Sequence, residues 1–210
     1  MQIVSNFLDT EECETLKHCI DFDETKHVTS YDNRLELEWK SDEWAKKLWK
    51  RWQPLHALPP QVMDELGGVW EPFAFDSTLT LIRQDTGYDR KGVESRLAWP
   101  EWRVRSFSTT LIHLNEIEQG GVTVFPDQYM TMEPKSGLAI TFVNDAVVYE
   151  TKTIEKGRKY LLSIPILYRL VKYEKGLERV ELFQLYQKAS KENQEEDWKA
   201  FMTYMTTLVP

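Results

Sequence analysis

The stretch that decides the fold runs from residue 119 to residue 160. Residues 119–126 read Gln-Gly-Gly-Val-Thr-Val-Phe-Pro, residues 132–144 read Met-Glu-Pro-Lys-Ser-Gly-Leu-Ala-Ile-Thr-Phe-Val-Asn, and residues 156–160 read Lys-Gly-Arg-Lys-Tyr. The paired glycines permit positive φ before an apolar run, and the proline ends that run because it cannot donate to a strand ladder. Further Pro- and Gly-containing turns follow. The pattern predicts short β-strands joined by tight turns, as in a sandwich or barrel.

Helices are expected on both sides of this β-rich core. Asp9 and Glu12 have the spacing of a capping box, and Ser41 precedes a helical pattern that stops before Pro54. The expected helices cover residues 10–20, 41–52, a short segment between 59 and 68, 177–190 and 192–208. The expected strands cover the first residues of the chain, then 35–39, 69–75, 78–84, 103–115, 122–125, 137–143, 147–151 and 159–171. These elements predict one α+β domain over residues 1–210.

Composition narrows the possible partners. The chain carries a net charge of −8, which argues against coating a nucleic acid, since phosphate contacts need clustered Lys and Arg. The basic, Trp-rich run at residues 44–52 has the spacing of a helix with one buried face. No segment has the apolar length of a membrane span, and the N-terminus lacks the pattern of a secretory signal. Only Cys13 and Cys19 occur, so a reducing cytoplasm is the expected compartment.

Several of these motifs resemble the catalytic core of the prolyl 4-hydroxylase branch of the Fe(II)/2-oxoglutarate oxygenases. They include Gly-Gly-x-Thr-x-Phe-Pro at residues 120–126, Pro-x-x-Gly-x-Ala at 134–139 and Gly-x-Lys at 157–159. The resemblance implies a double-stranded β-helix, or jelly roll, at about residues 69–171. Helical flanks would then cover residues 9–66 and 177–208.

The resemblance also implies an iron site whose ligands this sequence lacks. Members of the family hold the metal with His-x-Asp and a more distal His, and here these positions fall on Gly92, Glu94 and Tyr149. No histidine lies between His56 and His113 or after His113. Glycine offers no donor atom, and a phenol with a pKa near ~10 is a poor ligand for ferrous iron. We therefore expect no standard metal ligands, and Fe(II) binding that is weak at best.

The residues that the family uses to bind its cosubstrate, 2-oxoglutarate, are better preserved in this sequence than the iron ligands. The resemblance places Lys159 where the family pairs a Lys with the distal carboxylate of 2-oxoglutarate, and it places Thr123 and His113 on the lining of the same pocket. Each residue also has a structural interpretation: Lys159 as an exposed strand lysine, Thr123 as a strand-forming residue and His113 as a hydrogen-bonded core histidine. If the pocket is retained, 2-oxoglutarate or a similar dicarboxylate is the expected ligand.

Three functions remain open at this point. The first is a pseudo-oxygenase that binds a small carboxylate or a peptide in the jelly-roll pocket. The second is an active hydroxylase of the 2-oxoglutarate type, a dioxygenase whose altered site uses Glu94, His113 and Tyr149. The third is a non-catalytic interaction module that presents its Trp-rich helices to a partner protein. Neither nucleic acid nor membrane is expected as a partner.

Overall fold

The structure, a computed structural model, describes most of the chain up to residue 173. The described ranges are residues 1–22, 28–31, 33–55, 61–64, 68–89, 103–144 and 149–173. The helices expected over residues 177–190 and 192–208 lie outside these ranges, as does most of the segment that contains Gly92 and Glu94.

Two compact units make up the chain. The first comprises Met1–Leu58, Phe73–Trp99 and Arg105–Tyr168, and the second comprises Pro59–Pro72, Pro100–Val104 and Arg169–Pro210. All the residues discussed below as a candidate site belong to the first unit. The expectation of one domain over residues 1–210 stays a prediction.

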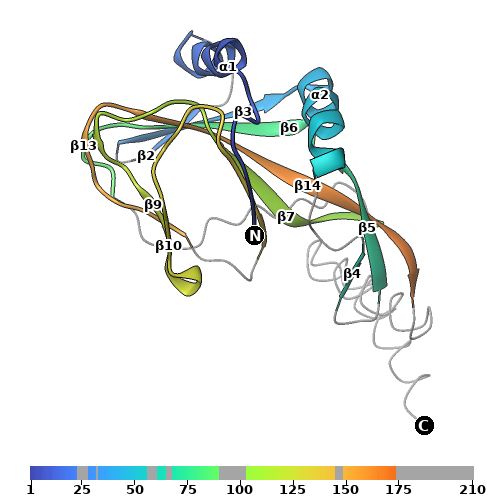
Figure 1. The fold of residues 1–210 in the computed structure, drawn as a ribbon. Helices are drawn as coiled ribbons and strands as arrows, with labels where there is room; N and C mark the ends of the chain where they lie inside the picture. Colours follow the sequence, from blue (N-terminus) through green and yellow to red (C-terminus); the bar gives the residue numbers. More distant parts are fainter. Residues whose placement is uncertain are drawn as a thin grey trace, which may run out of the picture. The chain divides into compact units, whose positions relative to one another are not determined.

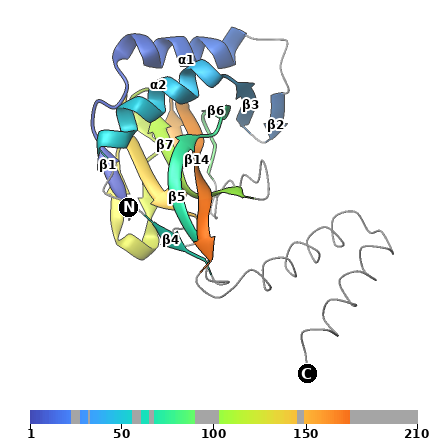
Figure 2. The same cartoon turned by 90° about the vertical axis from the view of Figure 1, so that its right-hand side faces the viewer.

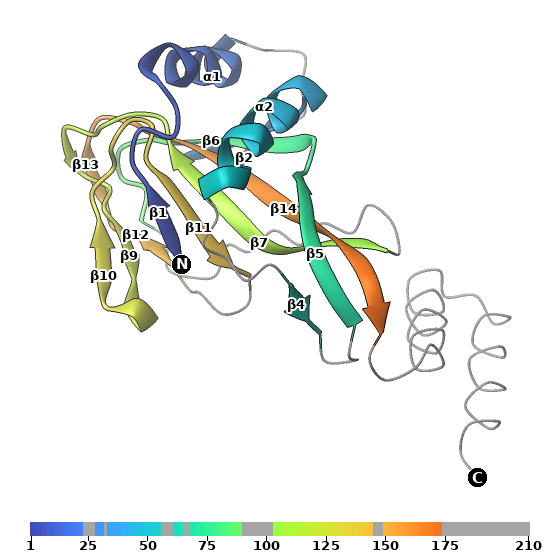
Figure 3. The same ribbon diagram turned by 45° about the vertical axis from the view of Figure 1, so that its right-hand side comes forward.

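The first unit is built around a long antiparallel sheet with strand order β1-β11-β7-β14-β6-β3-β2. Its strands are β1 (Gln2–Val4), β2 (Val28–Tyr31), β3 (Arg34–Lys40), β6 (Thr78–Gln84), β7 (Val104–His113), β11 (Ala139–Val143) and β14 (Lys159–Tyr173). A smaller sheet contains β9 (Thr123–Phe125), β10 (Met130–Met132) and β12 (Glu150–Thr151), and β8 (Gln119–Gly120) pairs with β13 (Ile154–Lys156). The smaller strands stand across the interior from the long sheet (Figures 1 and 3), which gives the double-stranded β-helix that the motifs implied.

Two helices, α1 (Thr10–Phe22) and α2 (Asp42–Trp52), lie on the outer face of the long sheet, as Figure 2 shows. The capping box of α1 is present: the Asp9 backbone N–H donates to Glu12 Oε2 at 2.9 Å, and the Glu12 N–H donates to Asp9 Oδ1 at 2.8 Å. Ser41 caps α2 by accepting a hydrogen bond from the Trp44 N–H at 3.3 Å. Both predicted helix starts are confirmed.

Aromatic packing anchors α2 to the first unit. Trp52 is 1% exposed, and its ring stacks on Trp49 and contacts Phe75 edge-on. The Trp52 indole N–H donates to Thr141 Oγ1 on β11 at 3.2 Å. A buried helix face therefore explains this part of the Trp-rich run. In the described part of the chain, no helix combines the length and apolar character needed to cross a membrane.

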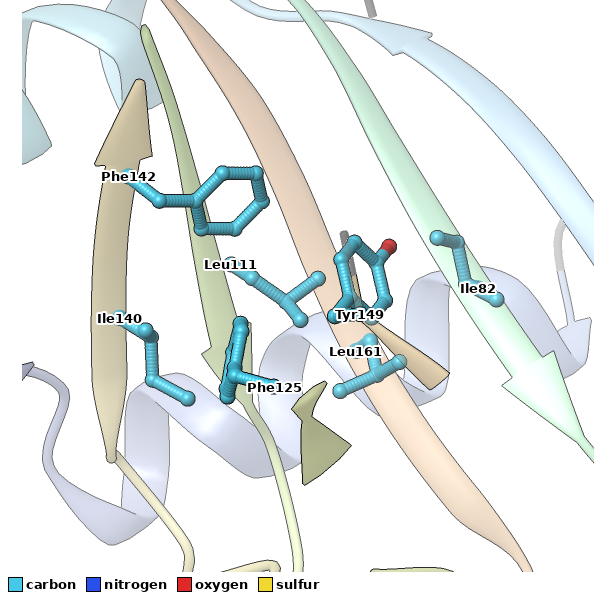
Figure 4. Close-up of a cluster of buried hydrophobic side chains, with 7 residues drawn as sticks. All are labelled: Ile82, Leu111, Phe125, Ile140, Phe142, Tyr149 and Leu161. Carbon is cyan, nitrogen blue, oxygen red and sulfur yellow. The ribbon is translucent and has the colours of Figure 1, made fainter. Parts of the chain in front are cut away.

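The inner side of the sheet carries an apolar cluster contributed by six strands or their flanks. Its members are Ile82, Leu111, Phe125, Ile140, Phe142, Tyr149 and Leu161. Figure 4 shows these side chains gathered in one interior, with Ile140 and Phe142 on the same strand. Since alternate residues of a strand share a face, the cluster identifies which other residues of these strands also face the interior.

The second unit contains the strand pair β4 (Val62–Met63) and β5 (Gly68–Phe75), although β5 ends in the first unit. Val62 pairs with Trp70, and the Trp70 indole N–H donates to Asp64 Oδ2 at 2.8 Å. The expectation of a short helix between residues 59 and 68 is therefore wrong at Val62–Met63. Pairing with β5 outweighs the Pro and Gly signals that suggested a helix.

The strand expectations differ from the structure mainly in the shortest elements. β6 has the predicted bounds, and β3, β5, β7, β11 and β14 lie within a few residues of theirs. The strands β2, β8, β10 and β13 were not predicted, nor were two 3-10 turns, Gln53–Leu55 and Pro126–Gln128. These four strands have only two to four residues, too few for alternation between apolar and polar positions to be seen in the sequence.

Candidate ligand site

Lys159 is the first residue of β14, and its side chain is fully buried. Its Nζ donates to the Gly121 carbonyl oxygen at 2.8 Å, to Thr123 Oγ1 at 2.8 Å and, more weakly, to Thr151 Oγ1 at 3.4 Å. The interpretation of Lys159 as an exposed strand lysine is therefore wrong. These oxygens hold an ammonium group inside the first unit, where an unbalanced charge is costly.

Lys159 faces the interior of the jelly roll. It lies two residues before Leu161, a member of the apolar cluster, and alternate strand residues share a face. Thr123 and Thr151 come from β9 and β12, which pair with each other at Thr123 and Thr151. The ammonium group is thus held between the long sheet and the smaller sheet.

His113 ends β7 and is also fully buried. It lies two residues after Leu111, so it faces the same interior as Lys159. Burial, and secondly the positive charge of Lys159, hold the pKa of His113 well below its usual value of 6.5. The imidazole is therefore neutral at neutral pH, with one nitrogen that donates and one that accepts.

The surroundings of His113 differ from those of an ordinary core histidine. Within the described ranges, neither Nδ1 nor Nε2 has a hydrogen-bond partner. A buried polar atom left in this state costs about 1–3 kcal/mol, so such atoms are rare in folded proteins. The expectation of a core histidine satisfied by a neighbour is not met by any described residue.

Gln84 completes the polar end of the interior. It ends β6, directly opposite Lys159 in the strand register, and its side chain is 1% exposed. Its Oε1 is likewise buried without a hydrogen-bond partner among the described residues. Because β14 lies between β7 and β6, the Lys159 side chain emerges between the strands that carry His113 and Gln84.

Tyr149 lies in the apolar cluster. It is 5% exposed, and its ring centroid lies 5.9 Å from that of Phe125 and 5.6 Å from that of Phe142 (Figure 4). These are distances of aromatic packing. At the position predicted for the distal metal ligand, the chain therefore has a ring that fills the core.

Solved structures with a similar architecture include prolyl hydroxylases from three organisms. A viral collagen prolyl hydroxylase from Paramecium Bursaria Chlorella virus-1, in complex with 2-oxoglutarate, is 18% identical, with a TM-score of 0.56 over 81% of this chain and 96% of the viral one. A Pseudomonas putida prolyl-4-hydroxylase is 16% identical, with a TM-score of 0.54 over 81% and 92%. A Trichoplax adhaerens prolyl hydroxylase is 14% identical, with a TM-score of 0.52 over 79% and 82%. No family model and no curated protein matches the sequence.

The fold is that of the prolyl 4-hydroxylase-like oxygenases. Identities this low show the fold alone, so the chemistry of the site has to come from the residues described above. The prolyl hydroxylase-like fold explains why Lys159, Thr123 and Tyr149 all reach one interior although they lie on three different strands or their flanks.

Of the three positions that the resemblance assigns to iron ligands, only Tyr149 lies among the described residues. Within those ranges, no three His, Cys, Asp or Glu side chains are grouped so that they could hold a metal ion. Tyr149 packs against two phenylalanines, and Gly92 and Glu94 lie outside the described residues. A buried ammonium flanked by hydroxyl groups and an imidazole suits a carboxylate better than a cation.

Two residues of the polar end were missed in the sequence. Gln84 lies two positions after Ile82, which faces the interior. Thr151 lies two positions after Tyr149, which the motif already marked as a candidate site residue. Strand alternation could have placed Thr151 beside Tyr149, because the sequence motif already set the register there. For Gln84 the sequence held no comparable signal, since its importance depends on the opposite strand.

Proposed function

We propose that this protein is a divergent prolyl hydroxylase-like jelly roll that binds a small carboxylate at Lys159 and does not perform standard iron-dependent oxygenation. The observation that carries the proposal is the buried Lys159 ammonium, held at the inner face by Thr123 and Gly121. The hydrogen bonds from the Lys159 ammonium to neutral oxygens are already charge-assisted, and a carboxylate adds the attraction between opposite charges, which is stronger in a buried site than in water. A carboxylate that enters the interior would therefore compete well with the hydroxyl groups for this ammonium.

The proposal is tested by measuring ligand binding to the full chain. Thermal unfolding is followed with 2-oxoglutarate, glutarate and succinate, each without added metal, and isothermal titration calorimetry gives the affinities. A ligand present at 100 times its Kd stabilises the folded state by about 2.7 kcal/mol, which corresponds to a rise of several degrees in Tm. Absence of binding by all three dicarboxylates would refute the proposal.

Lys159→Met removes the charge while keeping a long side chain. We expect it to abolish dicarboxylate binding, because no ammonium remains to pair with the ligand. Lys156→Met is the matched control, since Lys156 lies three residues earlier and its side chain is 70% exposed. Circular dichroism of both variants establishes that they fold. Loss of binding in the control as well would show only a general effect of net charge.

A metal assay separates this proposal from that of an altered oxygenase. The purified protein is incubated anaerobically with Fe(II), desalted and analysed for bound iron, and turnover of 2-oxoglutarate is followed by succinate formation. We expect neither stoichiometric iron nor turnover. Iron retained at one equivalent per chain, with succinate produced, would establish an oxygenase and contradict the proposal.

A further inference from the structure

The polar end of the interior contains buried hydrogen-bonding atoms of both kinds. A neutral His113 presents one N–H donor and one nitrogen acceptor, and Gln84 presents the acceptor Oε1. None of these atoms has a partner within the described part of the chain. A ligand that satisfies all of them must both accept and donate hydrogen bonds.

2-Oxoglutarate can accept hydrogen bonds in this site but cannot donate any. Its two carboxylates and its ketone are acceptors, so it can bind Lys159 and the imidazole N–H but has nothing to offer Gln84 Oε1 or the second imidazole nitrogen. Buried acceptors left without a donor weaken binding, in the same way that a site built for a hydroxyl rejects an analogue that lacks it. An oxo acid is therefore a poor match for this end of the interior.

The charge of Lys159 restricts which hydrogen-bond donor group a ligand can place beside Gln84 and His113. Lys159 lies directly opposite Gln84 in the strand register, and its charge acts on His113. A ligand ammonium group placed beside Gln84 and His113 would be repelled by this charge. A hydroxyl group donates without carrying charge and can also accept from the imidazole N–H.

We propose that the site selects a hydroxycarboxylate, in which a carboxylate pairs with Lys159 and a nearby hydroxyl group hydrogen-bonds with Gln84 and His113. This inference rests on the proposed carboxylate binding and adds the chemical class of the ligand. It involves no covalent step.

The test compares four ligands that differ only at one carbon: glutarate, 2-oxoglutarate and the two enantiomers of 2-hydroxyglutarate. Affinities are measured by calorimetry with the full chain and no added metal. One enantiomer of 2-hydroxyglutarate should bind about tenfold or more tightly than 2-oxoglutarate, which is the effect expected from one satisfied hydrogen bond in a buried site. Equal or tighter binding of 2-oxoglutarate would overturn the inference while leaving carboxylate binding intact.

Two variants connect this preference with the named residues. His113→Phe and Gln84→Met remove the unpartnered atoms, and both should remain folded, because replacing unsatisfied polar atoms by apolar ones is nearly neutral or stabilising. Each variant should lose most of the preference for the hydroxy acid, measured as the ratio of its affinities for 2-hydroxyglutarate and 2-oxoglutarate in the same variant. A preference that survives in both variants overturns the assignment. Failure of every dicarboxylate to bind would refute the proposed function and this inference together.

Discussion

Lys159 donates a hydrogen bond of 2.8 Å to Oγ1 of Thr123, a residue 36 positions earlier in the chain and on a strand of the other sheet. This contact joins β14 to β9 across the interior of the jelly roll. It fixes the ammonium group at the polar end, where His113 and Gln84 also face inward. The properties of the site depend on how this buried charge is held.

Replacing Thr123 by valine should weaken the fold. The substitution keeps the shape of the side chain and removes one acceptor of the buried ammonium, so we expect the free energy of unfolding to fall by about 1–3 kcal/mol in urea denaturation. Thr151→Val is the matched control, because its hydrogen bond to Lys159 is longer, at 3.4 Å. A loss in the control as large as that in Thr123→Val would contradict the assigned role of Thr123.

Tyr149 should behave as a core residue and not as a ligand. Tyr149→Ala removes the contacts with Phe125 and Phe142 and should lower the free energy of unfolding by about 3–5 kcal/mol. Tyr149→His restores the residue type found at a distal iron ligand, yet we expect it to destabilise the fold without conferring Fe(II) binding. The measurements are urea denaturation and metal analysis after incubation with Fe(II) under nitrogen. Stoichiometric iron in Tyr149→His would show that the metal site is intact apart from this residue.

His113 should make the protein less stable in mild acid. Its pKa in the folded state lies well below 6.5, so only the unfolded chain takes up the proton when the pH falls below about 6.5. The free energy of unfolding should then decrease by up to about 1.4 kcal/mol per pH unit, the limit for one proton. His113→Phe removes this contribution, and the difference between the two proteins should be constant above pH 7 and change below 6.5. Parallel stability curves from pH 7 to 5 would refute a buried neutral imidazole.

The Glu12 carboxylate should stabilise the folded state at neutral pH, and this contribution should be lost in acid, at a pH below that at which His113 acts. The Glu12 carboxylate accepts hydrogen bonds from Arg51 at 2.7 and 2.8 Å and pairs with Lys47, and the Arg51 hydrogen bond is the main cause that lowers its pKa from 4.5 to about 2. Because the folded-state pKa is lowered, the contribution is fully present above pH 4.5 and is lost as the pH falls toward 2.

The variant Glu12→Gln tests this contribution. We expect it to lower the free energy of unfolding at pH 7 by about 1–2 kcal/mol, a value reduced by the partial exposure of Arg51 and Lys47. The difference from the wild type should shrink between pH 4.5 and 2. Glu14→Gln is the control, because its pair with Lys17 is exposed and should matter little. An effect of Glu14→Gln equal to that of Glu12→Gln would contradict the contribution assigned to the pairing of Glu12 with Arg51.

Local chemistry made several features of this protein predictable. The capping box of Asp9 and Glu12 and the cap at Ser41 act over three residues, so the sequence contains everything that forms them. The long strands were recognised for a similar reason, since they alternate over enough residues to show which face is buried. The lack of histidine after His113 also needed no structure, because a ligand absent from the chain cannot be supplied by folding.

Tertiary structure alone decided the character of the interior. His113 has no described hydrogen-bond partner, Gln84 lies opposite Lys159, and Tyr149 packs against two phenylalanines. Each fact depends on residues from other strands. Strand register sets these neighbours, and register results from the packing of the whole sheet. For this reason the sequence by itself determined which groups are available for chemistry, whereas the fold decided which of them are buried together and what is left for a ligand to satisfy.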